Sequence, residues 1–183
     1  MSASVIPIGT SAHRARKTTS RKDKITLDKL QSMNFSQLDR LYRQLAPPDT
    51  LSELNGRRRG YVLSVAGLQH TPTAKLVSLL GNSRLLPWQG ISFTARSLIK
   101  GSGINRINLG ITRQEWFAFR TGFRTSLIDA RPCVHMNYQL RGNPWYIRQL
   151  IGELRKVDQD LYLGTGLVRM GQGRLKLLYF AIT

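Results

Sequence analysis

Short runs of apolar residues, bounded by turn residues, follow one another from Leu51 onward. Alternation of apolar and polar residues with a period of two is typical of β-strands, and Gly, Pro and Asp are typical of the turns between them. Long helices do not alternate with these runs, so we expect an antiparallel sheet. The pattern predicts about eight or nine strands, at residues 61–66, 88–95, 104–109, 115–120, 123–128, 133–138, 153–157, 161–170 and 174–182.

Two other segments have a helical period. Within residues 26–46 the apolar positions recur at spacings of three and four, which is typical of short amphipathic helices that pack through one face. We expect Ser36 to be an N-cap there, and Pro47-Pro48 to end the last turn. The stretch from Pro144 to about Ile151 predicts another short helix before the final strands.

The strand at 161–170 is apolar on both faces. A strand with one solvated face should be polar on that face, so we expect this strand to be covered on both sides. One face would meet the interior of a barrel, and the other would meet the helices at 26–46. Gly164 and Gly166 predict strong curvature or the close approach of another element. The fold class that follows is mainly β: an antiparallel barrel with N-terminal helices, whose interior holds side chains or one small ligand.

Basic residues outnumber acidic ones by 28 to 10, which gives a formal net charge of +18. Such an excess attracts polyanions, namely nucleic acid, anionic lipid headgroups or acidic proteins. Residues 1–24 are basic and lack apolar periodicity, which predicts a flexible tail before a single domain at 25–183. The same composition fits an organelle-targeting peptide, so both interpretations stay open.

Cysteine and histidine usage predicts no metal and no cofactor. Cys133 is the single cysteine, which excludes an internal disulfide and a multi-thiolate zinc site. His13, His70 and His135 have spacings that match no metal motif. No window approaches the roughly 18 apolar residues of a membrane-spanning helix. We therefore expect a cytoplasmic protein or one at the periphery of a membrane.

Three stretches of the sequence together resemble a known family. They are Leu51-Ser52-Glu53-Leu54-Asn55-Gly56 before the strand at Tyr61, Pro87-Trp88-Gln89-Gly90 followed by Phe93, and Asp158 to Gly164 with the hairpin Met170-Gly171-Gln172-Gly173-Arg174. The pattern resembles lipocalin-like (calycin) barrels, especially bacterial proteins of unassigned function, and is more weakly similar to plastid lipid-associated proteins of the fibrillin type. The resemblance covers residues 38–183, with Gly56-Arg57-Arg58 where lipocalins have Gly-x-Trp. It implies a barrel that carries a small apolar ligand, and it supplies no catalytic residue.

Candidate site residues follow from residue type. Glu115 and Glu153 lie beside strands, where burial in a barrel would raise the pKa of a carboxyl toward a catalytic range, and His135 shares a strand face with Cys133 and Asn137. An inward arginine would pair with a ligand carboxylate or phosphate. The ligand-binding candidates are Trp88, Phe93, Arg124, His135, Met136, Tyr138, Arg155 and Tyr162.

Three functions remain in competition. The first is binding of a lipid or another apolar small molecule in the barrel, at an anionic membrane surface. The second is a small cofactor-free cyclase or isomerase acting on an apolar substrate inside the barrel. The third is an RNA- or DNA-binding accessory protein, which is less favoured because no RRM-type aromatic motif, KH loop or zinc finger is present.

Overall fold

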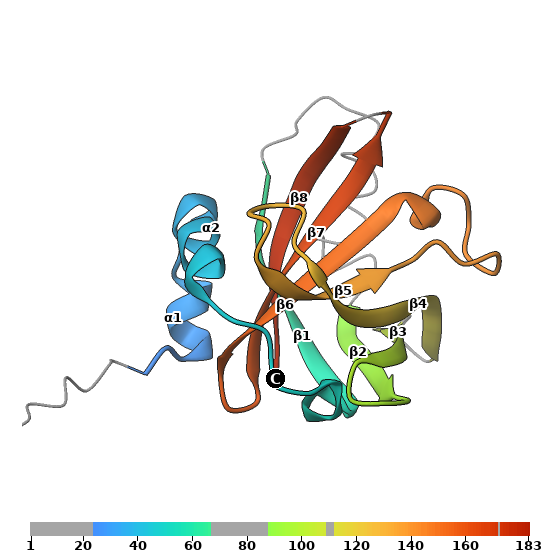
Figure 1. The fold of residues 1–183 in the computed structure, drawn as a ribbon, viewed down its shortest axis with the longest axis horizontal. Coiled ribbons are helices and arrows are strands. Elements are labelled where there is room, and N and C mark those ends of the chain that lie inside the picture. The colour runs from blue at the N-terminus through green and yellow to red at the C-terminus, as the bar shows by residue number, and fades with distance from the viewer. Residues whose placement is uncertain (1–23, 67–87, 109–111, 172) are drawn as a thin grey trace, which may run out of the picture.

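The protein is described by a computed structural model that covers residues 24–66, 88–108, 112–171 and 173–183. Eight strands form a closed antiparallel barrel in which each strand pairs with the next in sequence and β1 pairs with β8 (Figure 1). This confirms the predicted mainly β, antiparallel barrel. Residues 1–23 of the predicted tail 1–24, and Leu109 of the predicted strand 104–109, lie outside the described residues.

The helical elements are α1 (Leu27–Gln31), α2 (Phe35–Gln44) and the one-turn 3-10 helices η1 (Leu51–Leu54) and η2 (Ile147–Gln149). The strands are β1 (Gly56–Val65), β2 (Trp88–Ala95), β3 (Lys100–Asn108), β4 (Arg113–Thr125), β5 (Pro132–Asn137), β6 (Leu150–Asp158), β7 (Leu161–Met170) and β8 (Gly173–Ile182). In the ranges that the structure describes, every helix is too short and too polar to span a bilayer.

The helical region at 26–46 contains two helices, and α2 begins earlier than predicted. Asn34, rather than Ser36, is its N-cap. The Asn34 side chain accepts a hydrogen bond from the Gln37 amide at 3.0 Å, and the Gln37 side chain accepts one from the Asn34 amide at 2.9 Å. This reciprocal capping box gives hydrogen-bond partners to two amides that would otherwise lack them. A cap by the Ser36 hydroxyl alone would satisfy one, so the helix begins after Asn34.

The predicted strand 115–120 and the first part of the predicted strand 123–128 belong to one continuous strand, β4, so the predicted turn at Thr121-Gly122 is wrong. Residues 126–128, predicted as strand, lie in the loop that follows β4. Thr121 pairs with Gly101 on β3 and with Met136 on β5, so the ladder runs through this position on both sides. The strand bends elsewhere, at Phe117, which has a φ of 58° beside a register shift in the pairing with β3. A local turn signal is overridden when both neighbouring strands pair across it.

The predicted helix at 144–151 is only partly present. One 3-10 turn, η2, occupies Ile147–Gln149, and Leu150 already begins β6. Leu150 and Ile151 pair with Val168 and Leu167 on β7, so the apolar end of the predicted helix is instead the start of strand β6.

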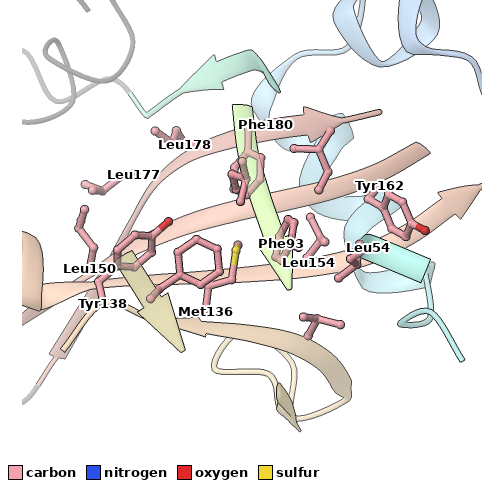
Figure 2. Close-up of a cluster of buried hydrophobic side chains, with 14 of the residues drawn as sticks. Leu54, Phe93, Met136, Tyr138, Leu150, Leu154, Tyr162, Leu177, Leu178 and Phe180 are labelled. Carbon is pink, nitrogen blue, oxygen red and sulfur yellow. The ribbon is translucent and has the colours of Figure 1, made fainter. Parts of the chain in front are cut away.

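Two hydrophobic clusters confirm that β7 is covered on both faces. Tyr162 and Val168 belong to the cluster inside the barrel, shown in Figure 2. Leu161 and Leu163 belong to a second cluster, which lies between the barrel and the helices. Gly164 confirms the predicted close approach, because a Cβ built there would lie 2.2 Å from Cζ of Phe180 on β8.

The helices α1 and α2 lie outside the barrel (Figure 1). Polar contacts fix α2 to β8. Asp39 on α2 accepts a hydrogen bond from the Tyr179 hydroxyl at 2.6 Å and forms ion pairs with Lys176 and Arg43. Burial raises the pKa of Asp39, but the hydrogen bonds from these three partners outweigh it and lower the pKa below its usual range. The charged Asp39 carboxylate therefore links α2 to β8.

The two ends of the barrel differ. At one end η1 leads into β1, and its residues Leu51 and Leu54 are buried in the interior cluster, so we call this the plugged end. The opposite end, which we call the distal end, is where β1, β3, β5 and β7 finish and β2, β4, β6 and β8 begin.

Candidate functional site

An apolar cavity of about 80 Å³ lies inside the barrel, in the half nearest the distal end. Every strand contributes to its wall; the contributors include Val62, Trp88, Asn105, Phe117, Met136, Leu150, Gly166 and Leu178. Toward the plugged end the interior is filled by side chains such as Phe93, Leu154 and Tyr162 (Figure 2).

Two glycines shape this cavity. A Cβ at Gly152 would lie 2.4 Å from Cε of Met136, so the Met136 side chain occupies the space that Gly152 leaves. At Gly166 a Cβ would lie 3.4 Å from Cγ of Leu178, an ordinary contact distance, so the space beside Gly166 is not taken. The cavity therefore owes part of its volume to the missing side chain at 166.

The polar groups in the wall form one short hydrogen-bonded chain. The Trp88 indole donates to Oδ1 of Asn105 at 3.0 Å, and Nδ2 of Asn105 donates to the Tyr138 hydroxyl and to the Phe117 carbonyl, each at 3.1 Å. Burial raises the pKa of Tyr138 to about 12, so its proton stays on the oxygen. Among the described residues that proton has no acceptor, which leaves one donor for a ligand inside an otherwise apolar wall.

The structure brings together some of the ligand-binding candidates. Trp88, Met136 and Tyr138 line the cavity. Phe93 and Tyr162 face the same interior but lie deeper: Phe93 packs on Phe119 with ring centroids 5.5 Å apart, and the Tyr162 hydroxyl donates to the Glu53 carbonyl at 3.3 Å.

Arg124, His135 and Arg155 are placed on the outer face of the barrel instead. His135 lies between Val134 and Met136, which both point inward, so the alternation of the strand turns it outward. Burial lowers the pKa of His135, so the uncharged ring is favoured. Sequence reasoning missed Asn105. The signal that could have found it is the partly buried Trp88, because its indole N–H needs an acceptor.

None of the three catalytic candidates lines the cavity. Glu115 is exposed on β4 and faces Arg106 across the ladder, and Glu153 is fully buried but on the outer face of β6. The wall contains no carboxyl group among the residues that the structure describes. Burial raises the pKa of the Cys133 thiol to about 12, which favours its protonated form.

Glu153 instead anchors the loop between β4 and β5. Its carboxylate accepts from the Ser126 hydroxyl and the Leu127 amide, each at 2.6 Å, and from the Tyr42 hydroxyl at 3.2 Å. These donors come from the loop and from α2, so one buried acid joins β6 to both. Its full set of partners indicates a structural role.

Arg155, two residues further along β6, is fully buried beside Glu153. It forms a bidentate ion pair with Asp129, both contacts at 2.7 Å, and donates to the carbonyl oxygens of Pro132, Tyr42 and Arg131. Its guanidinium also lies 4.5 Å from the centre of the Tyr42 ring. All its donors are used within the protein, so none is free for a ligand.

Acid is expected to weaken this ion pair. The hydrogen bonds from Arg155 hold the pKa of Asp129 down to about 2. Because the pKa of Asp129 is lower in the folded than in the unfolded state, its ionised carboxylate stabilises the folded protein. This stabilisation is fully present above about pH 4 and is lost as the pH falls through about 2. We expect the difference in free energy of unfolding between the wild type and Asp129→Asn to shrink as the pH is lowered from about 4 toward 2. Thermal unfolding at successive pH values measures it, and a constant difference would contradict the assignment.

Within the described ranges, no three His, Cys, Asp or Glu side chains are grouped so that they could hold a metal ion.

Comparison with known proteins adds information on the fold alone. No protein family model matches the sequence, and no curated protein matches it. The chain is similar in structure to a protein from Thermomonospora curvata, with a TM-score of 0.50 and 21% sequence identity over 82% of this chain and 87% of that one. At this identity the similarity shows a shared barrel architecture.

Proposed function

We propose that this protein binds an apolar small molecule, or the apolar end of a lipid, in the distal half of the barrel, as lipocalin-like carriers do. The observation that carries the proposal is the apolar cavity to which all eight strands contribute. Close packing normally leaves few voids larger than a water molecule, so an unfilled apolar space of this kind favours a ligand.

The size of the cavity limits the ligand. Its volume of about 80 Å³ exceeds the 10–15 Å³ that one water needs but lies below the roughly 300–1,000 Å³ typical of drug-sized ligands. The space suits a few carbon atoms, such as the end of an acyl or isoprenoid chain. Met136, an unbranched and adaptable side chain, forms part of the wall and can make room for more. The Tyr138 hydroxyl would donate to a single acceptor on the ligand.

Filling the cavity is expected to weaken ligand binding. Gly166→Leu extends an aliphatic side chain into the space, whereas Gly166→Ala adds one methyl group at ordinary contact distance from Leu178. With cis-parinaric acid as the fluorescent probe, we expect the Kd to rise at least about tenfold for Gly166→Leu and less than about threefold for Gly166→Ala. Titration of the probe into each purified variant measures this.

Two further variants test whether the loss of binding comes from filling the cavity. Val62→Phe fills the same cavity from β1, and should also weaken binding. Ile104→Phe likewise introduces a phenyl ring, on β3 beside the wall residue Asn105 but on the opposite strand face, and should leave binding unchanged. If native mass spectrometry finds the barrel always empty, and fatty-acid and isoprenoid probes do not bind the wild type, the proposal is wrong.

A further inference from the structure

Exposed large apolar side chains gather at the distal end of the barrel. Trp145 is 71% exposed and Met170 is 50% exposed, although both belong to types that are usually buried. Val65 at the end of β1, Trp116 near the start of β4 and Tyr146 beside Trp145 are also exposed. These five residues come from four separate parts of the chain, so folding alone assembles them at one end.

Contacts show that two of these parts lie side by side. Arg169, which precedes Met170 on β7, donates to the Gln139 side chain at 3.2 Å, and Gln139 belongs to the loop that carries Trp145 and Tyr146. The Trp145 and Tyr146 rings pack on each other, with centroids 5.8 Å apart. The loop and the end of the β7–β8 hairpin therefore form one side of the distal end.

The charge at this end is basic. Arg113, Arg141 and Arg174 are exposed there, at the start of β4, in the 138–149 loop and at the start of β8. Glu115 is the single acidic residue between Glu53 and Asp129 in the sequence, and none lies between Asp129 and Glu153 or after Asp160. We call these three arginines and the five apolar residues above the distal rim.

We propose that the distal rim docks on the surface of an anionic lipid bilayer. Trp and Tyr are the side chains that favour the boundary between acyl chains and headgroups, and arginines attract anionic headgroups. Exposed Val and Met side chains fit a lipid surface and would gain little from the phosphates of a nucleic acid. The rim also surrounds the end of the barrel that holds the apolar cavity.

Sedimentation of the full chain with vesicles tests this surface. The vesicles contain phosphatidylcholine with or without a minority of phosphatidylserine. We expect binding that requires phosphatidylserine, and a loss of affinity of at least about tenfold in Trp145→Ala/Tyr146→Ala. For Arg113→Gln/Arg141→Gln/Arg174→Gln we expect a loss of about 100-fold, because each basic residue at such a surface contributes about 1 kcal/mol and 1.4 kcal/mol is a factor of ten.

Matched variants away from the rim serve as controls. Leu98→Ser/Ile99→Ser removes an equally exposed apolar pair at the other end of the barrel, in the β2–β3 hairpin. Arg40→Gln/Arg57→Gln/Arg96→Gln removes the same charge from exposed positions on α2, on β1 and beside β2. Both should bind vesicles like the wild type. Equal losses in the rim and control variants would overturn the proposal, because binding would then follow net charge alone.

Two further measurements distinguish lipid docking from nucleic-acid binding and from ligand binding in the cavity. If the rim variants lose affinity for single-stranded RNA but none for vesicles, the rim is a nucleic-acid surface and the proposal is wrong. Gly166→Leu, which blocks the cavity, should keep its affinity for phosphatidylserine vesicles. Docking and ligand binding are therefore tested separately, and either can fail without the other.

Discussion

Replacing Arg155 with methionine is expected to lower the free energy of unfolding by about 3–5 kcal/mol. The substitution keeps an unbranched side chain of similar length but leaves Asp129 as a buried carboxylate without its bidentate partner. It also removes one donor from each of the carbonyl oxygens of Pro132, Tyr42 and Arg131. The last two keep a backbone amide donor, from Leu45 and Ser126 respectively. Urea denaturation, followed by circular dichroism, measures the change.

A double variant identifies the cause. In Arg155→Met/Asp129→Asn the unpaired charge is gone, so part of the lost stability should return, since removing both partners is less harmful than removing one. The folded fraction of Arg155→Met should still bind an acyl probe, because Arg155 lies outside the cavity. A change in stability below about 1 kcal/mol, as for a surface ion pair, would show that this ion pair is not buried in solution.

Gly90→Ala is expected to destabilise the barrel by at least about 3 kcal/mol. Gly90 has a φ of +121°, which a residue with a side chain rarely adopts. A Cβ there would lie 2.0 Å from the Arg58 carbonyl oxygen and 2.5 Å from the Gly60 nitrogen, both of them backbone atoms that cannot turn aside. The pairing of β1 with β2 would have to open at this point.

Gly142→Ala is the matched control for this variant. Gly142 lies in the loop between β5 and β6, and a Cβ there would have no atom within 4 Å. Its expected effect is within about 0.5 kcal/mol. Thermal and urea unfolding of the two alanine variants should therefore differ clearly. Equal stabilities would mean that the backbone at Gly90 relaxes at no cost.

The architecture could be predicted because the strand pattern carries information about both faces of the sheet. The strand at 161–170 is apolar on both sides, which indicated an interior and a covered exterior, and the structure places α1 and α2 against its outer face. The turn at Thr121-Gly122 could not be judged in the same way. Whether the chain turns at Thr121-Gly122 or continues as a strand depends on pairing with the neighbouring strands β3 and β5. The local sequence does not contain that information.

The cavity could be predicted in part. The aromatic and sulfur-containing residues Trp88, Met136 and Tyr138 were found because large apolar side chains fill a barrel. Assigning His135 to the wall together with Met136 conflicts with the period of two, since neighbouring residues on a strand face opposite sides. Arg155 was predicted to bind a ligand from its residue type alone, but it pairs with Asp129 within the protein. Its partner Asp129 lies in a loop, and the need for a buried ion pair there arises only when α2 covers that side of the barrel.

The pairing of β1 with β8 has a consequence for how the chain folds as it is made. Synthesis proceeds from β1 onward, and each later strand can add to the one before it, but β1 keeps an unpaired edge until β8 emerges. β8 also carries some of the most buried residues, Tyr179 and Ile182 among them, so the growing sheet lacks a complete core for most of its synthesis. A chain truncated before β8 would therefore be an open sheet with an unpaired edge and exposed apolar side chains. We expect such chains to aggregate and to be bound by chaperones and degraded by proteases.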